Sequence, residues 1–224
     1  MGITLEDLYY KYLALGHEKQ KKLQEILAED STYTIDFDNA ILSFDTGLKL
    51  SFEIIATHST EENSWLWIWG NEQWNRPIME DAKSLWLKEF GKKNSISVFE
   101  EPLIGLGGNW SASDVARICS ALCDSGAYFR YPYDYGAAFL LIEPCKELDE
   151  ATIEDMSFYH SCITDCWNLF DDGANKEITE SYLKIKNIPY TNEGNKLISE
   201  FGGSKMVLEF DTNNYAIGST LSLN

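Results

Sequence analysis

The feature that most constrains this fold is a run of three tryptophans at alternate positions. The run spans residues 64–71 and has the sequence Ser-Trp-Leu-Trp-Ile-Trp-Gly-Asn. Side chains alternate between the two faces of a strand, so this spacing puts the tryptophans on one face and the leucine and isoleucine on the other. Both faces are then apolar, which predicts a central strand covered on both sides.

The two faces of this strand carry different expectations. Leu66 and Ile68 are expected to point into the main core, beneath the helix that begins the chain. The three tryptophans are expected to lie on the opposite face, at least partly covered by later helices. Asn71 is expected to end the strand, because its side chain can bond the backbone of the turn.

The composition indicates a folded protein with a sizeable core. The chain has 224 residues, of which 44% are hydrophobic and 13% aromatic, and this composition disfavours disorder. No apolar run approaches the roughly 20 residues that span a bilayer, so no membrane partner is predicted. The first seven residues lack the basic and apolar regions of a signal peptide, and five cysteines are an odd number for a disulfide framework. We therefore expect a cytoplasmic protein with free thiols.

The net charge of -18 predicts repulsion of nucleic acids and of anionic membranes. Acid is concentrated in the middle of the chain. Residues 95–175 contain 14 Asp and Glu but only three cations, which are Arg117, Arg130 and Lys146. This excess either keeps the protein soluble or forms a surface for a basic protein partner.

Hydrophobic periodicity predicts a helix followed by an antiparallel meander. Apolar residues recur at helical spacing from about residue 4 to 28, with Thr4 and Asp7 at the positions of a capping box. Strand-like segments follow at 32–37, 40–44 and 48–57 and in the tryptophan run. Their short links favour antiparallel pairing between neighbours.

The rest of the chain mixes helices and strands. Helices are predicted at 79–90, 111–124, 149–171, 178–185 and 196–201. Strands are predicted at 96–99, 127–131, 137–143, 206–210 and 215–221. Because strands and helices do not strictly alternate, the predicted class is α+β: an antiparallel meander sheet packed against helices, with a C-terminal helical segment and a closing β-hairpin. We expect residues 1–145 to form one domain and residues 146–224 to pack on the same core.

The tryptophan run also resembles the signature of a known family. Residues 65–72 are similar to the WLWAWANES-type strand of an uncharacterised bacterial domain family, a domain of unknown function. Further likenesses to the family's short hairpin and to its "G-x-Y-R-x-P" segment lie at residues 35–38, 41–44 and 126–132. In this chain Phe129 is inserted before the arginine, and Gly70 stands where the family usually has alanine. The likeness covers roughly residues 1–145. It implies a bacterial origin and a shared fold, and it implies no activity, because the family has no established catalytic residues.

No sequence motif predicts a catalytic or metal site. Cys119 and Cys123 share a face of one predicted helix, and Cys162 and Cys166 share a face of another, so four thiolates could in principle form a tetrahedral zinc site. Structural zinc ligands more often lie on knuckles and turns, and cysteine packs well on a helix as a small apolar residue. Catalysis by a Cys–His pair has no local signature in this chain. We expect no metal, no cofactor and no catalytic residue, and we favour a protein that is not an enzyme.

Aromatic residues supply the candidate binding surface. Residues 131–135, Tyr-Pro-Tyr-Asp-Tyr, form a predicted turn whose side chains are partly exposed beside an acid, as in an interaction surface. The alternative is that packing in the core and the turn accounts for these aromatics. The residues predicted to bind a ligand or partner are Trp65, Trp67, Trp69, Asn71, Arg76, Arg130, Tyr131, Tyr133 and Tyr135.

Two hypotheses of function remain. The first is a non-catalytic domain that binds a basic protein partner, as an immunity protein or inhibitor does. The second is a small-ligand protein or enzyme with a pocket walled by the tryptophan face, in which Asn71, Arg76 or Arg130 anchors polar groups. Neither hypothesis involves a nucleic acid or a membrane.

Overall fold

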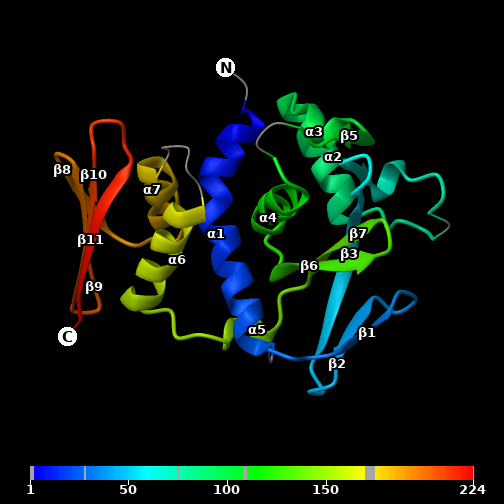
Figure 1. Cartoon of the computed structure of the whole chain (residues 1–224), viewed down its shortest axis with the longest axis horizontal. Helices are drawn as coiled ribbons and strands as arrows, with labels where there is room; N and C mark the ends of the chain where they lie inside the picture. Colours follow the sequence, from blue (N-terminus) through cyan, green and yellow to red (C-terminus); the bar gives the residue numbers. More distant parts are fainter. Residues whose placement is uncertain (1–2, 28, 75, 108–109, 170–174, 224) are drawn as a thin grey trace.

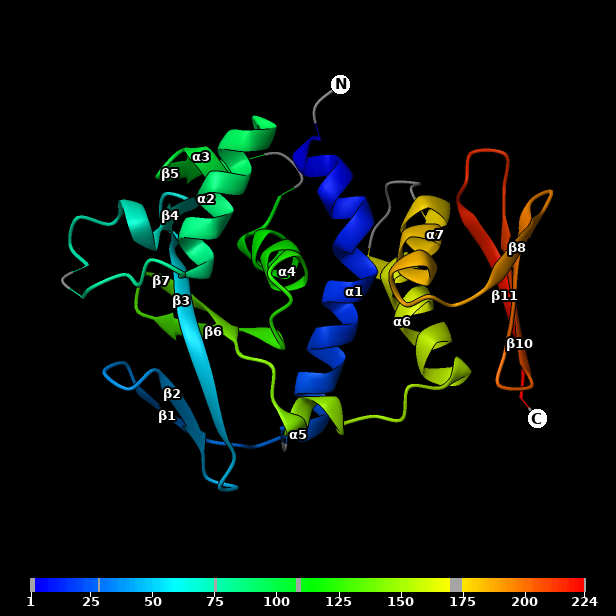
Figure 2. The ribbon, with the colours of Figure 1, turned by 180° about the vertical axis from the view of Figure 1, so that it is seen from behind.

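A long N-terminal helix lies between two groups of elements. The structure, a computed structural model, describes residues 3–27, 29–74, 76–107, 110–169 and 175–223. Figure 1 and Figure 2 show helix α1 upright in the centre, with one sheet and its helices on one side and the C-terminal helices and a second sheet on the other. The protein is therefore of the predicted α+β class.

Helix α1 (Leu5–Ile26) begins at the predicted capping box. The backbone N–H of Asp7 donates to Thr4 Oγ1 at 3.1 Å, and the backbone N–H of Thr4 donates to Asp7 Oδ2 at 2.7 Å. These two bonds satisfy backbone donors that have no partner within the first turn of a helix. Leu8 and Leu13 are buried along the helix.

The larger sheet is antiparallel throughout, and its first four strands form the predicted meander. Within the described residues it contains seven strands, which are β1 (Tyr33–Asp36), β2 (Ile41–Phe44), β3 (Lys49–Ser59), β4 (Ser64–Trp67), β5 (Leu103–Gly105), β6 (Ala127–Tyr133) and β7 (Gly136–Ile142). The long strand β3 pairs with β2 at its beginning and with both β4 and β7 further along. The sheet therefore curls around β3, with β5 at one edge beside β4 and β6 at another beside β7.

In the tryptophan run, Ile68 is buried as predicted, but the tryptophan face rather than Leu66 joins the core cluster that contains residues of α1. Trp65 and Trp67 are fully buried and share a core cluster with Leu8 and Leu13 of α1, whereas Leu66 on the opposite face is only half-buried. The strand also ends at Trp67, and the chain continues as a short 3-10 helix, η1 (Ile68–Gly70). An indole buries more apolar area than leucine, so covering the tryptophan face with helices stabilises the fold more.

Helices α2 (Lys83–Asn94), α3 (Ser97–Glu100) and α4 (Ala112–Leu122) accompany this sheet. Helix α4 begins at a capping box, since the backbone N–H of Asp114 donates to Ser111 Oγ at 3.2 Å. Two predictions are wrong. Residues 96–99 fall largely within helix α3 rather than a strand, and α2 spans Lys83–Asn94 rather than the predicted 79–90.

The C-terminal part contains α5 (Lys146–Asp149), α6 (Met156–Leu169), α7 (Asn175–Ile185), β8 (Tyr190–Glu193), β9 (Lys196–Phe201), β10 (Ser204–Phe210) and β11 (Ala216–Ser222). The predicted closing hairpin is β10–β11, which belongs to a four-stranded antiparallel sheet in the order β11-β10-β9-β8.

The helix predicted from residue 149 begins only at Met156 as α6. Its predicted last residues, Phe170 and Asp171, lie outside the described residues.

The helix predicted at residues 196–201 is wrong, because this segment is strand β9. Gly202 and Gly203 join β9 to β10, and both have positive φ angles, of 59° and 82°. Two consecutive positive φ angles are typical of a type I′ hairpin turn, which favours Gly-Gly. In the resulting strand, Leu197 and Ser199 are buried on the same face, and the Ser199 hydroxyl donates to the carbonyl of Pro189.

The core is continuous from one side of α1 to the other. One buried cluster joins Leu8 and Trp67 with Tyr159 of α6, Tyr182 of α7 and Leu208 of β10. In the described part of the chain, no helix has both the length and the apolar character needed to span a bilayer.

Candidate binding cleft

A cleft lies where the β1–β2 turn, strand β3 and the start of α2 meet. Its volume is about 670 Å³, which is within the usual range of about 300–1,000 Å³ for ligand pockets. Between η1 and α2, the chain contributes Ile68, Trp74 and most of residues 76–82 to one wall. Glu143, directly after β7, completes the lining.

Aromatic and aliphatic side chains form most of the walls. Phe37 comes from the β1–β2 turn and Phe52 from β3, and Trp74, Ile78 and Met79 come from the segment before α2. Phe52 is buried, Trp74 is half-buried and Met79 is largely exposed. The cleft thus offers apolar surface both in its interior and at its rim.

Glu53 ties the middle of β3 to the start of α2. Its two carboxylate oxygens accept the backbone N–H groups of Lys83 and Ser84, at 2.9 and 3.1 Å. The residue before the helix is Ala82, which cannot cap it with a side chain. A carboxylate at this position also complements the positive end of the helix dipole. The cap therefore holds α2 against the sheet and sets one end of the cleft.

The remaining charged groups of the cleft are mostly paired. Lys83 Nζ pairs with Glu143, and Arg76 pairs with Asp38 at 2.8 Å. Asp81 is exposed and has no ion-pair partner among the described residues. The described lining residues include four carboxylates, from Asp38, Glu53, Asp81 and Glu143, and two cations, from Arg76 and Lys83. The lining is therefore net acidic and suits a cationic group attached to an apolar body.

Two of the predicted tryptophans are core residues. Trp65 and Trp67 are 0% exposed, and the indole N–H of Trp67 donates to the carbonyl of Val98 at 2.7 Å. Trp69 is half-buried, and Lys88 Nζ lies 4.0 Å from the centre of its ring. None of the three lines the cleft, so the wall that tryptophan supplies there comes from Trp74 instead.

The predicted polar anchors are separated. Asn71 Oδ1 accepts the backbone N–H of Gln73 at 3.0 Å, which is the predicted bond to the turn, although the strand ends earlier than predicted. Arg76 lines the cleft. Arg130 is exposed on β6 and is not among the residues that line the cleft.

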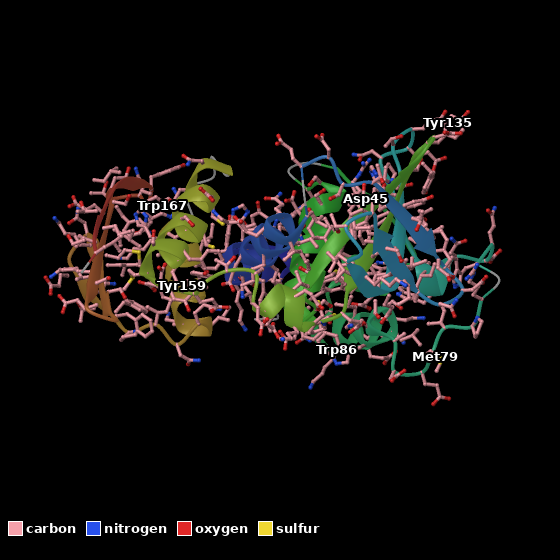
Figure 3. All side chains as sticks on the ribbon, turned by 90° about the horizontal axis from the view of Figure 1, so that it is seen from below. Asp45, Met79, Trp86, Tyr135, Tyr159 and Trp167 are labelled. Carbon is pink, nitrogen blue, oxygen red and sulfur yellow. The ribbon has the colours of Figure 1, made fainter. Side chains whose placement is uncertain are left out.

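The predicted tyrosine turn lies on another side of the molecule. Tyr133 and Tyr135 are exposed at the β6–β7 turn, whereas Tyr131 is half-buried and packs its ring on Phe37 with 5.6 Å between ring centres. In Figure 3, Tyr135 is at the upper edge of the molecule and Met79 is at the lower edge. The sequence-predicted residues therefore belong to two surfaces and to the core rather than to one site.

Sequence reasoning identified Arg76 and missed the residues that surround it. The missed lining residues include Phe37, Asp38, Glu53, Trp74, Met79, Asp81, Lys83, Ser84 and Glu143. The short spacing of Trp74 and Arg76, beside Pro77, is a local signal that could have marked this segment. The others come from parts of the chain that only the fold brings together.

Burial raises the pKa of each of the five cysteine thiols above its ordinary value. Helices α4 and α6 lie on opposite sides of α1, which separates Cys119 and Cys123 from Cys162 and Cys166 (Figure 1). Burial raises the pKa of the Cys123 and Cys162 thiols to about 12, so neither is a thiolate near neutral pH. Among the described residues, no three His, Cys, Asp or Glu side chains gather where they could hold a metal ion.

Comparison with known proteins identifies a family for the part of the chain that contains the cleft. A family model described as "Family of unknown function (DUF6882)" matches residues 6–144. No curated protein and no solved structure matches the chain. The matched range includes every lining residue of the cleft, from Phe37 to Glu143.

Proposed function

This chain belongs to DUF6882, a family of unknown function, and we propose that it is a non-catalytic domain that binds a basic segment of a partner protein in its acidic cleft. The observation that carries this proposal is the lining, in which four carboxylates and two cations lie among aromatic and aliphatic walls. Such a lining complements a segment that combines a cationic and an apolar residue.

The charge of the whole chain supports the same class of partner. A net charge of -18 attracts basic segments over long distances and accelerates their encounter with the cleft. The same charge disfavours nucleic acids and anionic membranes, which are themselves negatively charged. A cytoplasmic location, expected from the sequence, is part of the proposal.

Exposed apolar side chains extend the surface beyond the cleft. Met79 stands at its rim, and Trp86 lies on α2 three residues after Lys83 and is 48% exposed. Figure 3 shows Met79 and Trp86 toward the same edge of the molecule. Exposed aromatic and methionine side chains are enriched in protein interfaces, which supports a protein rather than a small molecule as the ligand.

The engagement of the carboxylates supports binding rather than catalysis. Glu53 is bonded to the start of α2, Glu143 to Lys83, and Asp38 to Arg76. Each of these three carboxylates would have to give up its present partner before it could exchange a proton with a ligand, as a general acid or base must. The alternative is a small cationic ligand, for which the cleft volume is also suitable.

A peptide-binding measurement with matched variants tests the proposal. The probe is an array of peptides of about ten residues that combine arginine or lysine with leucine, methionine or phenylalanine. We expect some of these peptides to bind the wild-type protein, and Asp81→Asn to weaken that binding by about threefold or more, because it removes an exposed rim carboxylate. The matched control is Asp134→Asn, the same exchange in the exposed β6–β7 turn.

Each outcome of this measurement decides between sites. Weakening by Asp81→Asn alone supports the cleft. Weakening by Asp134→Asn alone moves the site to the tyrosine turn, and equal weakening by both indicates general attraction to an acidic protein. If no peptide binds while single amino acids or amines do, the small-ligand alternative replaces the proposal.

A further inference from the structure

Arg76 is held in the cleft as a bound cation would be. Its guanidinium lies 2.8 Å from an Asp38 oxygen, 5.9 Å from the centre of the Phe37 ring and 5.8 Å from the centre of the Trp74 ring. A carboxylate together with two aromatic faces is the environment in which proteins bind guanidinium and ammonium groups. All four side chains belong to the lining of the cleft.

This arrangement contributes little to holding the fold together. The Asp38 side chain is 86% exposed and that of Arg76 is 35% exposed, and exposed ion pairs are weak because water screens them. Between Asn71 and Ala82, the described residues form neither helix nor strand. The backbone hydrogen bonds found there join Trp74 to Asn71 and Ala82 to Met79. A rotation of the Arg76 side chain out of the cleft therefore disturbs few other contacts.

We infer that Arg76 occupies the subsite for a ligand guanidinium, and that an arginine side chain of the partner takes its place between Asp38, Phe37 and Trp74. The inference rests on the proposed function and specifies its partner. Arginine fits better than lysine, because its planar group stacks on aromatic rings and bonds a carboxylate through two N–H groups. Arg76 itself demonstrates that a guanidinium fits this position.

Ser84 provides a second anchor in the same cleft. Its side chain is 0% exposed and lines the cleft, and its Oγ has no hydrogen-bond partner among the described residues. A buried hydroxyl without a partner is costly, so it gains from a polar group that enters the cleft.

Replacement of Arg76 tests this inference, because the Arg76 side chain competes with a ligand arginine for the same position in the cleft. The probe is Nα-acetyl-arginine amide, compared with the corresponding lysine and citrulline amides, and affinity is measured by isothermal titration calorimetry. Citrulline has nearly the shape of arginine and no charge. We expect Arg76→Ala to bind the arginine amide about tenfold more tightly than wild type, in the order arginine, lysine, citrulline. A second variant, Arg76→Gln, gives the same comparison if the alanine variant folds poorly.

Two further variants locate the binding. Asp38→Asn in the Arg76→Ala background should return the affinity to the wild-type level, because the carboxylate partner is removed. Arg130→Ala is the matched control, since this arginine lies outside the cleft, and it should bind like wild type. Equal or weaker binding by Arg76→Ala and Arg76→Gln than by wild type overturns the inference, as does tight binding of the citrulline amide.

The failure of this inference can be distinguished from failure of the proposed function. If basic peptides bind and Asp81→Asn weakens them, but Arg76→Ala also weakens them, the function stands and Arg76 contacts the partner directly. If no peptide binds wild type while Arg76→Ala binds the arginine amide, the subsite stands and the peptide proposal fails.

Discussion

At the residue scale, Trp67 illustrates how an aromatic motif serves the core. Its side chain is 0% exposed, contacts the rings of Trp65 and Phe99, and donates its indole N–H to the carbonyl of Val98. We predict that Trp67→Ala lowers the free energy of unfolding by about 3–5 kcal/mol, the usual cost of removing a large buried aromatic. Urea unfolding of the variant measures the loss.

Trp86→Ala is the control for this prediction. Trp86 is half-exposed and stacks on Phe90 at the surface of α2, so its removal should cost less than about 1 kcal/mol. An unfolding midpoint of Trp67→Ala close to that of wild type would contradict the assignment of Trp67 to the core. Combined with lost ligand binding, that result would restore the tryptophan face as a functional surface.

At the element scale, the junction of α2 and α3 depends on a glycine inside a helix. A Cβ atom added to Gly91 would lie 2.5 Å from Phe99 Cβ and 3.2 Å from the carbonyl oxygen of Ile96. Alanine normally stabilises a helix interior by about 1 kcal/mol relative to glycine. Here we predict that Gly91→Ala destabilises the protein instead, by about 1–3 kcal/mol, because α3 must move away from α2.

Lys92→Ala provides the matched control on the same helix. Lys92 is exposed and pairs with Glu89 one turn earlier, so its replacement should change stability by no more than about 0.5 kcal/mol. Thermal unfolding of the two variants and wild type makes the comparison. A more stable Gly91→Ala variant would mean that α2 and α3 pack less closely than the structure indicates.

At the scale of the whole molecule, a network of charges joins α1 to the C-terminal helices. Glu18 of α1 is buried, accepts a hydrogen bond from Tyr182 at 2.7 Å and pairs with Lys22 and Lys186. The same two lysines pair with Glu154, just before α6. The network therefore connects the helix that supports the larger sheet to the C-terminal helices.

This network predicts a loss of stability in acid. Burial alone would raise the pKa of the Glu154 carboxyl, but hydrogen bonds from Lys186 and Lys22 outweigh it and lower the pKa to about 2, from an ordinary value of 4.5. A carboxyl with a lowered pKa stabilises the folded state fully above its unfolded pKa, and the contribution disappears as pH falls through the folded pKa. We expect Glu154→Gln to be less stable than wild type near neutral pH, and the difference to shrink between pH 4.5 and about 2.

Urea unfolding across this pH range measures the difference between the two proteins. The wild type should lose stability more steeply with acid than Glu154→Gln does. Parallel pH dependence of the two proteins would show that the lysines do not hold Glu154 ionised, and that packing alone joins the C-terminal helices to α1.

Features that depend only on neighbouring residues can be predicted from the amino-acid sequence. The caps at Thr4 and Ser111 follow from local hydrogen bonding, and the first four strands pair as a meander because their links are short. The family likeness, expected over residues 1–145 and found over residues 6–144, also depends on contiguous sequence. Strand β9 was missed even though its Gly202-Gly203 turn is a local hairpin signal, because its apolar residues were assigned to a helix.

The tertiary structure alone decided which apolar surface is buried and where the cleft lies. Both faces of the tryptophan strand are apolar, so periodicity defines two faces and cannot select one. In the fold, Trp67 packs on Phe99 of α3 and Trp65 on Phe139 of β7, within the core cluster that also contains residues of α1. The cleft unites Asp38, Arg76 and Glu143 from distant parts of the chain. Their proximity results from the curl of the sheet around β3 and from the capping of α2, both of which are long-range contacts that no local pattern specifies.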